Sequence, residues 1–393
     1  MVQNLPVPFD RRVWQEALAL RDVVASVTVI SPADDKFPAG QFEIDGVNVR
    51  RYSAPPEGVG IAGYLREYFV SLRAIRREVK VVSKIRSIQI VHICNPPDFL
   101  FLAVRRLTRR GAALIFDQHD LGPELIDAKQ MKFGAFFRLA TRLMEALTYR
   151  SADHVISTNN SYRTIAITRG RFPSSQVTVV RSGPSSSWIK EGEVDPAWRR
   201  GRRHLIGYVG VMGRQDGLEY LLRATKCLIR DGLDVELALA GSGPDLARLK
   251  QLASELGVVD HVQFLGRVSD EDLRSVLASA DVCVNPDEVN KMNDLSTMNK
   301  ILEYMAMGRP IVQFDVMEGR YSAGSSARYA APNDVESLAS EIRWVLEHPM
   351  EAKEMGSEGK RRFQQELCWE QQVPKLRAAY ASVLRAHDAE ASQ

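Results

Sequence analysis

Two glycine-rich turns are the first segments of this sequence whose residue types and spacing point to chemistry. The segment GYVGVMGRQDG (207–217) leads from an apolar run into a helical pattern, and AGSGP (240–244) ends the next apolar run. Glycines let backbone N–H groups approach a phosphate, and they aim the N-terminus of the following helix at it. Tight turns without a ligand are the alternative. Ligands of open α/β sheets bind at the carboxyl ends of the strands, so we predict a nucleotide site that includes Gly210, Gly213, Arg214, Gly241 and Gly243.

A third candidate segment is NDLSTMNKILEYMAMGRPIV (293–312). Ser296 and Thr297 are good N-caps, so the sequence predicts a helix that begins there and runs to Met307, with Gly308 as its C-cap. The hydroxyl and amide groups at the start of this helix, together with its backbone N–H groups, are suited to hold an anion. We therefore add Ser296, Thr297 and Asn299 to the predicted nucleotide site, which the family resemblance given below implies is the donor site.

The charged pair of that helix strengthens the prediction. Lys300 lies three residues before Glu303, so both side chains leave the same side of the helix. A cation near a helix N-terminus opposes the helix dipole, and that local cost makes sense if an anionic ligand binds there. The alternative is a solvent-exposed ion pair between the two side chains.

Polar residues also follow the predicted strands of the N-terminal half. His119 comes directly after the apolar run 113–118 and is followed by Asp120 and then by Gly-Pro-Glu. A lone histidine is more often structural, and Asp120 has the alternative role of an N-cap. A His-Asp pair at the carboxyl end of a strand nevertheless favours a functional role. The polar residues expected to line this edge are Arg11, Arg12, Asn95, Asp120, Glu124 and Arg181. The family resemblance given below implies that they bind an acceptor substrate.

Short β-branched runs alternate with helical periodicity along the whole chain, which is typical of successive βαβ units around a buried parallel sheet. The pattern restarts after a stretch rich in Ser and Pro. The sequence therefore predicts two doubly wound α/β domains, at 1–190 and 200–365, and a C-terminal helix at 366–393 that packs back on the first domain. The predicted strands are 26–31, 88–93, 113–118, 154–158, 176–182, 204–210, 235–243, 262–266, 281–287, 310–315 and 327–332.

The start of the first domain is irregular. Only Met1 and Val2 precede the loop 3–9, although the first strand of a doubly wound sheet is typically central. We expect a truncated or very short first strand. Either the natural start lies upstream of Met1, or this domain is weakened.

Length and composition exclude several classes of protein. The 393 residues, of which 45% are hydrophobic and 26% charged, amount to two or three ordinary domains rather than a disordered or collagen-like chain. No apolar run of 18 residues occurs, and the most apolar helix candidate, 133–149, is interrupted by charges. The start lacks the pattern of a signal peptide, so we expect a cytoplasmic protein. The four cysteines have no metal-ligand spacing and should be free thiols.

The net charge of +3 hides two opposite halves. Residues 1–200 carry a net charge of +9 and the remainder carries −6. Most of the excess lies in residues 66–86 and 105–110. The alternatives are two solvated helix faces or a peripheral contact with anionic lipid at the inner face of the plasma membrane. Nucleic acid is not expected as a partner, because no aromatic platform accompanies the basic residues.

Taken together, these motifs resemble those of the retaining glycosyltransferases of family 4. The C-terminal half contributes EYMAMGRPIV (303–312), AGSGP (240–244), FLG (264–266) and ADVCVNP (280–286). PVPFDRRVW (6–14) and HDLGPE (119–124) resemble the N-terminal acceptor domain of a bacterial branch of that family. The resemblance covers essentially the whole chain.

The resemblance implies a GT-B fold, in which two Rossmann-like domains face a central cleft. It implies transfer of a sugar from a UDP- or GDP-sugar to a lipid-linked or polysaccharide acceptor, with retention, by front-side attack, without a metal or cofactor. Glu303 matches the residue that holds the donor ribose hydroxyls, and a histidine near the place of His119 touches the transferred sugar in the family. Together with Lys300 these two are the expected catalytic residues.

The sequence departs from the family pattern at three positions. Leu295 stands where a second Glu is usual, and Val211 and Asp216 stand where an Arg and a Lys usually neutralise the donor diphosphate. Lys300 and Arg214 are the cations left for that role, and Lys300 is favoured. The alternatives are a noncatalytic protein that binds sugar nucleotides and, with the same fold, a sugar-nucleotide epimerase or a phosphorylase.

Overall fold

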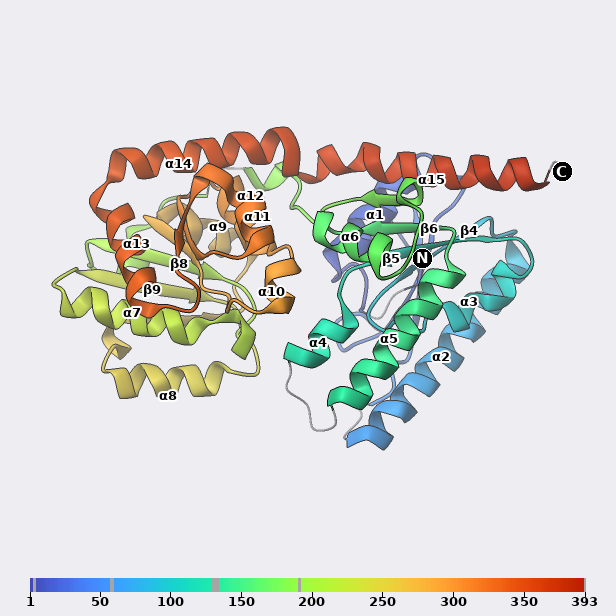
Figure 1. Cartoon of the computed structure of the whole chain (residues 1–393), viewed down its shortest axis with the longest axis horizontal. Coiled ribbons are helices and arrows are strands. Elements are labelled where there is room, and N and C mark those ends of the chain that lie inside the picture. Colours follow the sequence, from blue (N-terminus) through green and yellow to red (C-terminus); the bar gives the residue numbers. More distant parts are fainter. Residues whose placement is uncertain (3–4, 57–59, 129–133, 190–191, 392–393) are drawn as a thin grey trace. The chain divides into compact units, whose positions relative to one another are not determined.

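The computed structural model describes residues 1–2, 5–56, 60–128, 134–189 and 192–391. Contacts divide the chain into two units: an N-terminal unit of Met1–Arg181 with Gln372–Gln393, and a C-terminal unit of Ser182–Gln371. Each is an α/β unit built on a mainly parallel sheet (Figure 1). The predicted boundaries at 190 and 365 thus move to 181 and 371. Position 190 and the predicted residues 3, 4 and 133 lie outside the described residues.

The sheet of the N-terminal unit has the strand order of a dinucleotide-binding fold, with Val2 in the place of a first strand. Val2 forms parallel bridges to Ile30 on one side and to Ile93 on the other. A cavity of about 510 Å³ borders Met1 and Val2. The strands are, in spatial order, β2 (Gly40–Ile44), β3 (Val47–Tyr52), β1 (Thr28–Pro32), then Val2, then β4 (Ile90–Cys94), β5 (Ala113–Gln118), β6 (His154–Ser157) and β7 (Val177–Val179).

The structure adds a hairpin that the sequence prediction lacks. β2 runs antiparallel to β3, and the turn between them places Asp45 and Gly46 at φ angles of +48° and +77°. Asp-Gly is a favoured pair for this kind of two-residue hairpin turn, because both central residues need positive φ. The dipeptide was therefore a usable signal. The strands predicted from β-branched runs in this half are confirmed as β1 and β4–β7.

The helices of the N-terminal unit follow the predicted helical spacing. α1 (Arg11–Arg21) is capped by Asp10, whose carboxylate accepts a hydrogen bond from the Val13 N–H at 3.1 Å. No helix in the described part of the chain is both long and apolar enough to cross a membrane. The other helices are α2 (Gly60–Ile85), α3 (Phe101–Thr108), α4 (Gly122–Ala128), α5 (Gly134–Ser151) and α6 (Asn160–Thr168).

The C-terminal unit has one six-stranded parallel sheet, and its strands are those predicted. Its order is β10 (Val262–Gly266), β9 (Val235–Ala240), β8 (His204–Val209), β11 (Val282–Asn285), β12 (Ile311–Phe314) and β13 (Ala327–Ala330). The first strand, β8, is central and β9 is buried along its whole length, as expected of a sheet covered on both faces. The helices are α7 (Leu218–Arg230), α8 (Leu246–Leu256), α9 (Asp270–Ser279), α10 (Lys291–Leu295), α11 (Asn299–Ala306), α12 (Met317–Ala323), α13 (Val335–Glu347) and α14 (Pro349–Arg362).

The end of the chain returns to the N-terminal unit, as predicted. A π-helical segment (Phe363–Leu367) follows α14, and α15 (Trp369–Ala391) then runs on to the C-terminus (Figure 1). Within α15, Arg377 donates to the Ala19 carbonyl at 3.0 Å and the Tyr380 hydroxyl lies 2.7 Å from His92 Nδ1. Long-range contacts therefore fix this helix against the first unit.

Candidate active site

The two glycine turns of the C-terminal unit lie against each other at the carboxyl ends of β8 and β9. The N–H of Gly210 donates to Ala240, and that of Met212 donates to Ser242, at 3.0 and 3.1 Å. A Cβ on Gly241 would stand 1.8 Å from the Gly210 carbonyl oxygen, and one on Gly243 would stand 2.5 Å from that of Met212. These glycines are thus required by the close approach of two backbones.

This packing corrects one part of the prediction. The amides of Gly210, Gly213 and Gly241 donate within the protein, to Ala240, to Asp216 and to Gly266. They are therefore not the phosphate-binding N–H groups that the sequence predicted. The turns do lie together at the ligand edge of the sheet, and the exposed side chain of Arg214 extends from the first of them.

A buried ion cluster lies under the first turn. Lys300 Nζ is 2.6 Å from Asp287 Oδ1 and 3.7 Å from Asp216 Oδ1, and its Cε would be 3.1 Å from a Cβ on Gly210. Nζ also lies over the Tyr208 ring, 5.1 Å from its centre. The alternative of a solvent-exposed ion pair on α11 is wrong, because Lys300 is buried and its ion pairs are with two aspartates on other segments.

The three charged groups of this cluster change one another's pKa values. Burial raises the pKa of Asp287 to about 6, although the neighbouring Lys300 acts against that shift. Burial likewise raises the pKa of Asp216. Burial would lower the pKa of Lys300, but the two aspartates outweigh it and raise that pKa. Lys300 is therefore an ammonium at neutral pH, held by two carboxylates whose ionisation is made harder by burial.

The helix that carries Lys300 begins later than predicted. Ser296 ends the short helix α10, and its hydroxyl donates to the Met292 carbonyl at 2.7 Å. α11 begins at Asn299, and its N-cap is Met298, which makes no side-chain capping bond. The predicted N-cap role of Ser296 and Thr297 is thus wrong, because α10 takes up the residues just before them. Ser296 and Thr297 are half-buried, Asn299 is exposed and Glu303 is half-buried on α11.

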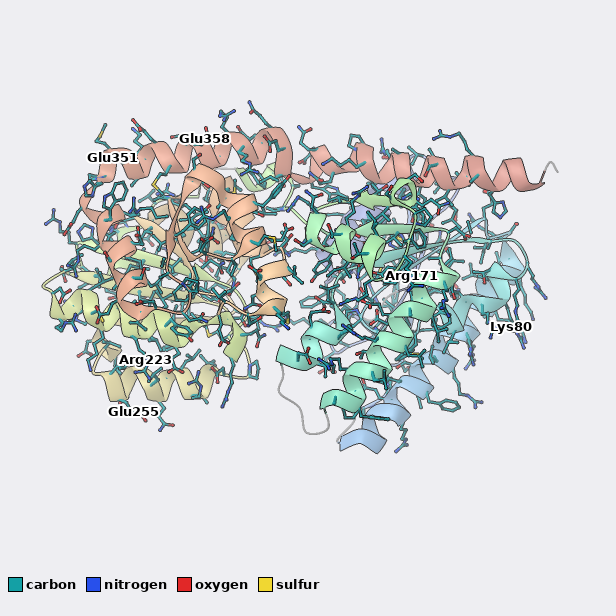
Figure 2. All side chains as sticks on the ribbon, viewed as in Figure 1. Lys80, Arg171, Arg223, Glu255, Glu351 and Glu358 are labelled. Carbon is teal, nitrogen blue, oxygen red and sulfur yellow. The ribbon has the colours of Figure 1, made fainter. Side chains whose placement is uncertain are left out.

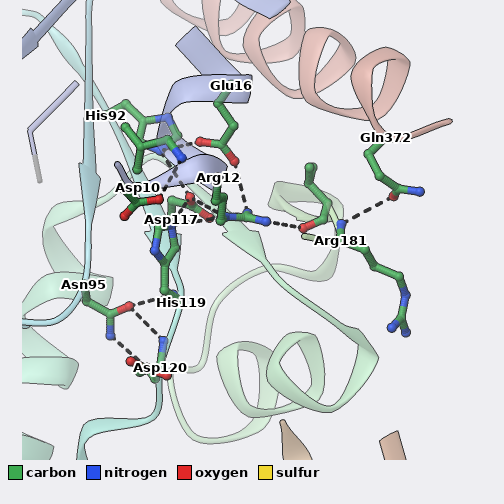
Figure 3. A network of polar contacts seen from close by, with 12 residues as sticks. Asp10, Arg12, Glu16, His92, Asn95, Asp117, His119, Asp120, Arg181 and Gln372 are labelled. Atoms are coloured by element: carbon green, nitrogen blue, oxygen red, sulfur yellow. Dashed lines mark hydrogen bonds and ion pairs between the residues drawn. The ribbon is translucent and has the colours of Figure 1, made fainter. Parts of the chain in front are cut away.

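The carboxyl edge of the N-terminal sheet holds a second buried cluster (Figure 3). Arg12 of α1 donates to both carboxylate oxygens of Asp117, through Nη2 at 2.7 Å and Nε at 3.0 Å, and to the Val180 carbonyl at 2.8 Å. Glu16 lies one helical turn on, with Oε1 3.1 Å from Arg12 Nη2. Arg12 is therefore a buried counter-ion and not the acceptor-binding residue that the sequence predicted, because its guanidinium faces the core of the unit.

His119 and Asn95 meet at the same edge. The Asn95 side chain accepts the His119 N–H at 2.7 Å and donates to the Asp120 carbonyl at 2.8 Å. His119 Nε2 lies 2.5 Å from Asp117 Oδ2, and part of the imidazole is exposed. Asn95 is buried, so its role is to hold the main chain of 119–120 rather than to bind an acceptor directly.

The other predicted acceptor residues differ from one another in burial and in their hydrogen-bond partners. Glu124 makes a two-pronged ion pair with Arg169, at 2.5 and 3.2 Å. Arg181 is buried, and its N–H donates to Gln372 of α15 at 3.3 Å. Asp120 is half-buried and Arg11 is exposed on α1. Glu124 is therefore held by Arg169, while Asp120 and Arg11 stay candidates for contact with a substrate. Arg181 stays a candidate as well, because its bond to Gln372 is made by the backbone N–H and not by the guanidinium.

Sequence reasoning missed Asp117 and Asp287, which hold His119 and Lys300. Both come at or just after the end of a buried strand, β5 or β11. A charged residue in the last positions of an apolar strand is the signal that was available, since buried charges are paired.

Two family descriptions match most of the chain. "Glycosyl transferase 4-like domain" matches residues 10–183, and "Glycosyl transferases group 1" matches residues 203–348. These ranges fall in the N-terminal and the C-terminal unit, respectively, apart from the first two residues after the unit boundary. The two glycine turns and α11 lie in the second range.

Curated relatives agree with this assignment over part of their length. D-rhamnosyltransferase WbpZ of Pseudomonas aeruginosa is 30% identical over 187 residues, covering 45% of this chain and 46% of that protein. The MMP alpha-(1->4)-mannosyltransferase of Mycolicibacterium hassiacum is 29% identical over 192 residues, covering 48% and 45%. The matched region thus spans less than half the length of these relatives.

Solved structures match nearly the whole chain. Sucrose-phosphate synthase from Thermosynechococcus elongatus superposes with a TM-score of 0.77 at 19% identity, covering 98% of this chain and 99% of that one. Anabaena HepE in complex with UDP-glucose gives a TM-score of 0.73 at 16% identity, covering 97% and 99%. This likeness shows the fold, which is the predicted GT-B fold of two Rossmann-like units. The matched ranges, the fold and the placement of the glycine turns together show that the chain belongs to the group 1 glycosyltransferases.

Proposed function

We propose that this protein transfers a sugar, with retention, from a UDP- or GDP-sugar to a lipid-linked or saccharide acceptor. The observation that carries the proposal is the buried Lys300 directly beneath the first glycine turn of a group 1 glycosyltransferase. An ammonium buried at the ligand edge of an α/β sheet is well placed to stabilise charge that develops on a leaving diphosphate. That HepE was solved with UDP-glucose supports a nucleotide-sugar donor.

The proposed chemistry needs no protein nucleophile. The bond between the sugar C1 and the β-phosphate oxygen breaks, and the acceptor hydroxyl forms a new bond to C1 on the same face. The hydroxyl proton passes to the departing phosphate oxygen. Lys300 and Arg214 stabilise the diphosphate, Glu303 accepts hydrogen bonds from the ribose hydroxyls and His119 contacts the transferred sugar. We propose that the reaction proceeds without a metal or cofactor.

Replacing Glu303 with Gln tests the donor site. The amide keeps the shape of the side chain but gives up the charge-assisted hydrogen bonds to a cis-diol, which are roughly twice as strong as neutral ones. We expect the donor KM to rise by about 10-fold to 100-fold, since one lost charge-assisted hydrogen bond is worth about 1.5–3 kcal/mol. Donor hydrolysis and transfer are followed by NMR, which also reads the anomer formed. Inversion of the anomer would refute the retaining mechanism, and an unchanged KM would refute the role of Glu303.

The same experiment separates the alternatives. A noncatalytic protein would bind UDP- or GDP-sugars in a thermal-shift assay without releasing nucleotide, since binding to the native state raises its melting temperature. An epimerase would change the sugar without releasing nucleotide, and a phosphorylase would need inorganic phosphate. The ion cluster is the observation that favours the noncatalytic alternative, because two carboxylates surround its single ammonium.

A lipid-linked acceptor is supported by two exposed helix faces of the N-terminal unit, which we call the basic-apolar surface. On α5 the exposed face carries Phe136, Leu139 and Leu143 beside Arg142, and the one acidic residue of the helix, Glu145, is buried. On α2 the exposed residues include six cations and three large apolar side chains: Arg66, Arg73, Arg76, Arg77, Lys80 and Lys84, with Tyr68, Phe69 and Val70 (Lys80 is labelled in Figure 2). Aromatic and leucine side chains among Arg and Lys are typical of helices that lie in a membrane interface.

Both helices contact the same loop of the unit. Tyr68 of α2 packs its ring against Phe99, with 5.0 Å between ring centres, and Thr148 of α5 donates to the Asp98 carbonyl. Figure 1 shows that the two helices also begin at the same end of the unit. We therefore propose that this surface, with the exposed arginines of 105–110, contacts anionic lipid at the inner face of the plasma membrane.

Vesicle flotation tests the basic-apolar surface. The wild type is expected to float with vesicles that contain about one third phosphatidylglycerol and not with pure phosphatidylcholine, because each basic residue near an anionic surface contributes about 1 kcal/mol. The triple variant Phe136→Ser, Leu139→Ser, Leu143→Ser should bind at least about 10-fold more weakly, since burying each of these side chains is worth about 1.5–3 kcal/mol. The control replaces three equally exposed apolar residues of the other unit, Val259, Met317 and Met350, with Ser. Equal binding of both triple variants would contradict the proposal.

A further inference from the structure

Asp117 is the centre of the buried cluster in the N-terminal unit (Figure 3). Its Oδ1 accepts from Arg12 Nη2, and its Oδ2 accepts from Arg12 Nε and lies 2.5 Å from His119 Nε2. Asp117 is completely buried, whereas the His119 side chain is 16% exposed. One residue of this pair thus belongs to the interior and the other reaches the ligand edge of the sheet.

The proton arrangement of this pair follows from its partners. A guanidinium has only donors, so both oxygens of Asp117 act as acceptors. Burial alone would raise the pKa of Asp117, but the charges of Arg12 and His119 outweigh it and hold the pKa well below the usual 3.8. Arg12 Nε lies 3.1 Å from His119 Nε2 as well, but its N–H is shared with Asp117 Oδ2 at 3.0 Å. The contact of His119 Nε2 with the ionised Asp117 is the shorter one, at 2.5 Å, which places the ring proton on Nε2. In the neutral imidazole Nδ1 is then the acceptor, and in the imidazolium Nδ1–H is a donor.

The main chain of His119 is held separately. Asn95 Oδ1 accepts the N–H groups of His119 and Asp120, at 2.7 and 3.2 Å. Asn95 Nδ2 in turn donates to Asp98 Oδ1 at 2.7 Å. The backbone is therefore fixed by Asn95, which leaves the orientation of the imidazole ring to Asp117.

A further set of buried groups lies between Asp117 and the C-terminal helix. His92 Nε2 lies 3.5 Å from both Asp117 Oδ2 and Glu16 Oε2, and His92 Nδ1 lies 2.7 Å from the hydroxyl of Tyr380 in α15. Burial and the charge of Asp117 raise the pKa of Glu16 well above 4.5, and burial lowers the pKa of His92. Burial thus disfavours the charged forms of both Glu16 and His92, while Arg12 and Asp117 balance each other's charge.

A metal site is the competing explanation for these groups. His92, Cys94 and Asp117 offer ligand atoms within 4.8 Å of one another. Both oxygens of Asp117 already accept hydrogen bonds from Arg12, however, and burial raises the pKa of Cys94 well above its usual 9.0. A thiol that keeps its proton is a poor ligand, because metals bind the thiolate.

We propose that Asp117 is the positioning residue of His119: it holds Nε2, so that Nδ1 is presented to the transferred sugar, and Tyr380 of α15 holds Asp117 in place through His92. The inference rests on the proposed function for the role of His119 toward the sugar. The proposal itself concerns the orientation of the His119 imidazole, which can be measured without any enzymatic turnover. The contact of Tyr380 with His92 thus gives α15, at the C-terminal end of the chain, a role in the site.

Long-range ¹H–¹⁵N correlation spectra of histidine-labelled protein test the proposal. At pH 9, well above the ordinary pKa of histidine of about 6.5, His119 of the wild type should show the Nε2–H tautomer, with assignment from the His119→Gln variant. The Nδ1–H tautomer in the wild type would overturn the proposal on that spectrum alone. Asp117→Asn should turn the single tautomer into a mixture and lower kcat at least 10-fold with the donor KM within about threefold. These values correspond to the loss of one charge-assisted hydrogen bond.

Two further variants complete the experiment. Asp153→Asn is the matched control, because it neutralises another carboxylate that is hydrogen-bonded at β5: Asp153 accepts from the Leu114 N–H at 2.7 Å. It should leave the His119 spectrum unchanged. Tyr380→Phe removes one hydroxyl and serves if Asp117→Asn does not fold; it should shift the His119 ring resonances and lower kcat about twofold to fivefold. A Tyr380→Phe spectrum identical to the wild type would overturn the anchoring role. If His119→Gln keeps full activity while the wild-type tautomer is as expected, the proposed role of His119 fails and its orientation by Asp117 stands.

Discussion

Replacing Lys300 with Met is expected to reduce sugar transfer at least about 100-fold, because removing one preorganised group that stabilises developing charge usually costs that much in kcat. The same change leaves Asp287 and Asp216 without their cation. Breaking a buried pair by removing one partner costs about 3–5 kcal/mol, so the variant should also unfold at a lower urea concentration.

The pH dependence of that loss has a definite sign. Loss of Lys300 removes what lowers the pKa of Asp287, so this pKa rises further above about 6 in the folded state. A carboxylate with a raised folded-state pKa binds a proton more readily folded than unfolded, so the stability of the variant increases as the pH falls from 8 toward 5. We therefore expect the difference in unfolding free energy from the wild type to be large at pH 8 and smaller at pH 5.

The double variant Lys300→Met, Asp287→Asn separates charge balance from catalysis. It removes the ammonium together with its 2.6 Å partner. Its unfolding free energy should return to within about 1 kcal/mol of the wild type, since replacing both partners of a buried pair is often nearly neutral. Its turnover should stay low. A double variant that is both stable and active would show that Lys300 serves only to balance the aspartates.

Replacing Arg12 with Met is expected to cause the largest loss of stability in the N-terminal unit. It leaves the completely buried Asp117 without the guanidinium that donates to both its oxygens, and the Val180 carbonyl without its donor. The expected cost is again about 3–5 kcal/mol, a large fraction of the 5–15 kcal/mol that stabilises an ordinary domain. Urea unfolding followed by circular dichroism measures it.

The neighbouring Arg11 provides the control for this change. It lies on the same helix, but its side chain is exposed. Arg11→Met should alter the unfolding free energy by less than about 0.5 kcal/mol, the usual range for surface substitutions. Equal effects of the two substitutions on stability would show that the Arg12–Asp117 pair does not stabilise the unit.

Several features of the site were readable because they depend on neighbours in the sequence. The β-branched runs before the glycine turns predicted β8 and β9, and the turns themselves fall where predicted. Gly241 and Gly210 adopt φ angles of +140° and +151°, which only glycine reaches easily. The Asp-Gly pair of the β2–β3 hairpin is an equally local signal, although the predicted strands did not include this hairpin. Local preferences of this kind depend on a few adjacent residues and not on the tertiary contacts of the segment.

Other features were predicted wrongly because a longer-range contact outweighed the local preference. Ser296 has the properties of an N-cap, yet it ends α10, which is capped by Asn290 and tied by Asn293 to the Gln215 carbonyl at 2.8 Å. Arg12 is an arginine beside the exposed Arg11 on the same helix, so its residue type predicts a surface position, yet it is buried. Residue type alone does not show which of two adjacent helix positions faces a carboxylate on a distant strand.

The sequence alone was enough to predict the two doubly wound units, the ligand edge of each sheet and the glycine turns at that edge of the second sheet. These follow from periodicity and from turn chemistry, which are properties of short segments. Only the tertiary structure decided which charges are paired: Arg12 with Asp117, 105 positions away, and Lys300 with Asp287. Pairing depends on which groups lose water together, and desolvation is set by the packing of the whole unit.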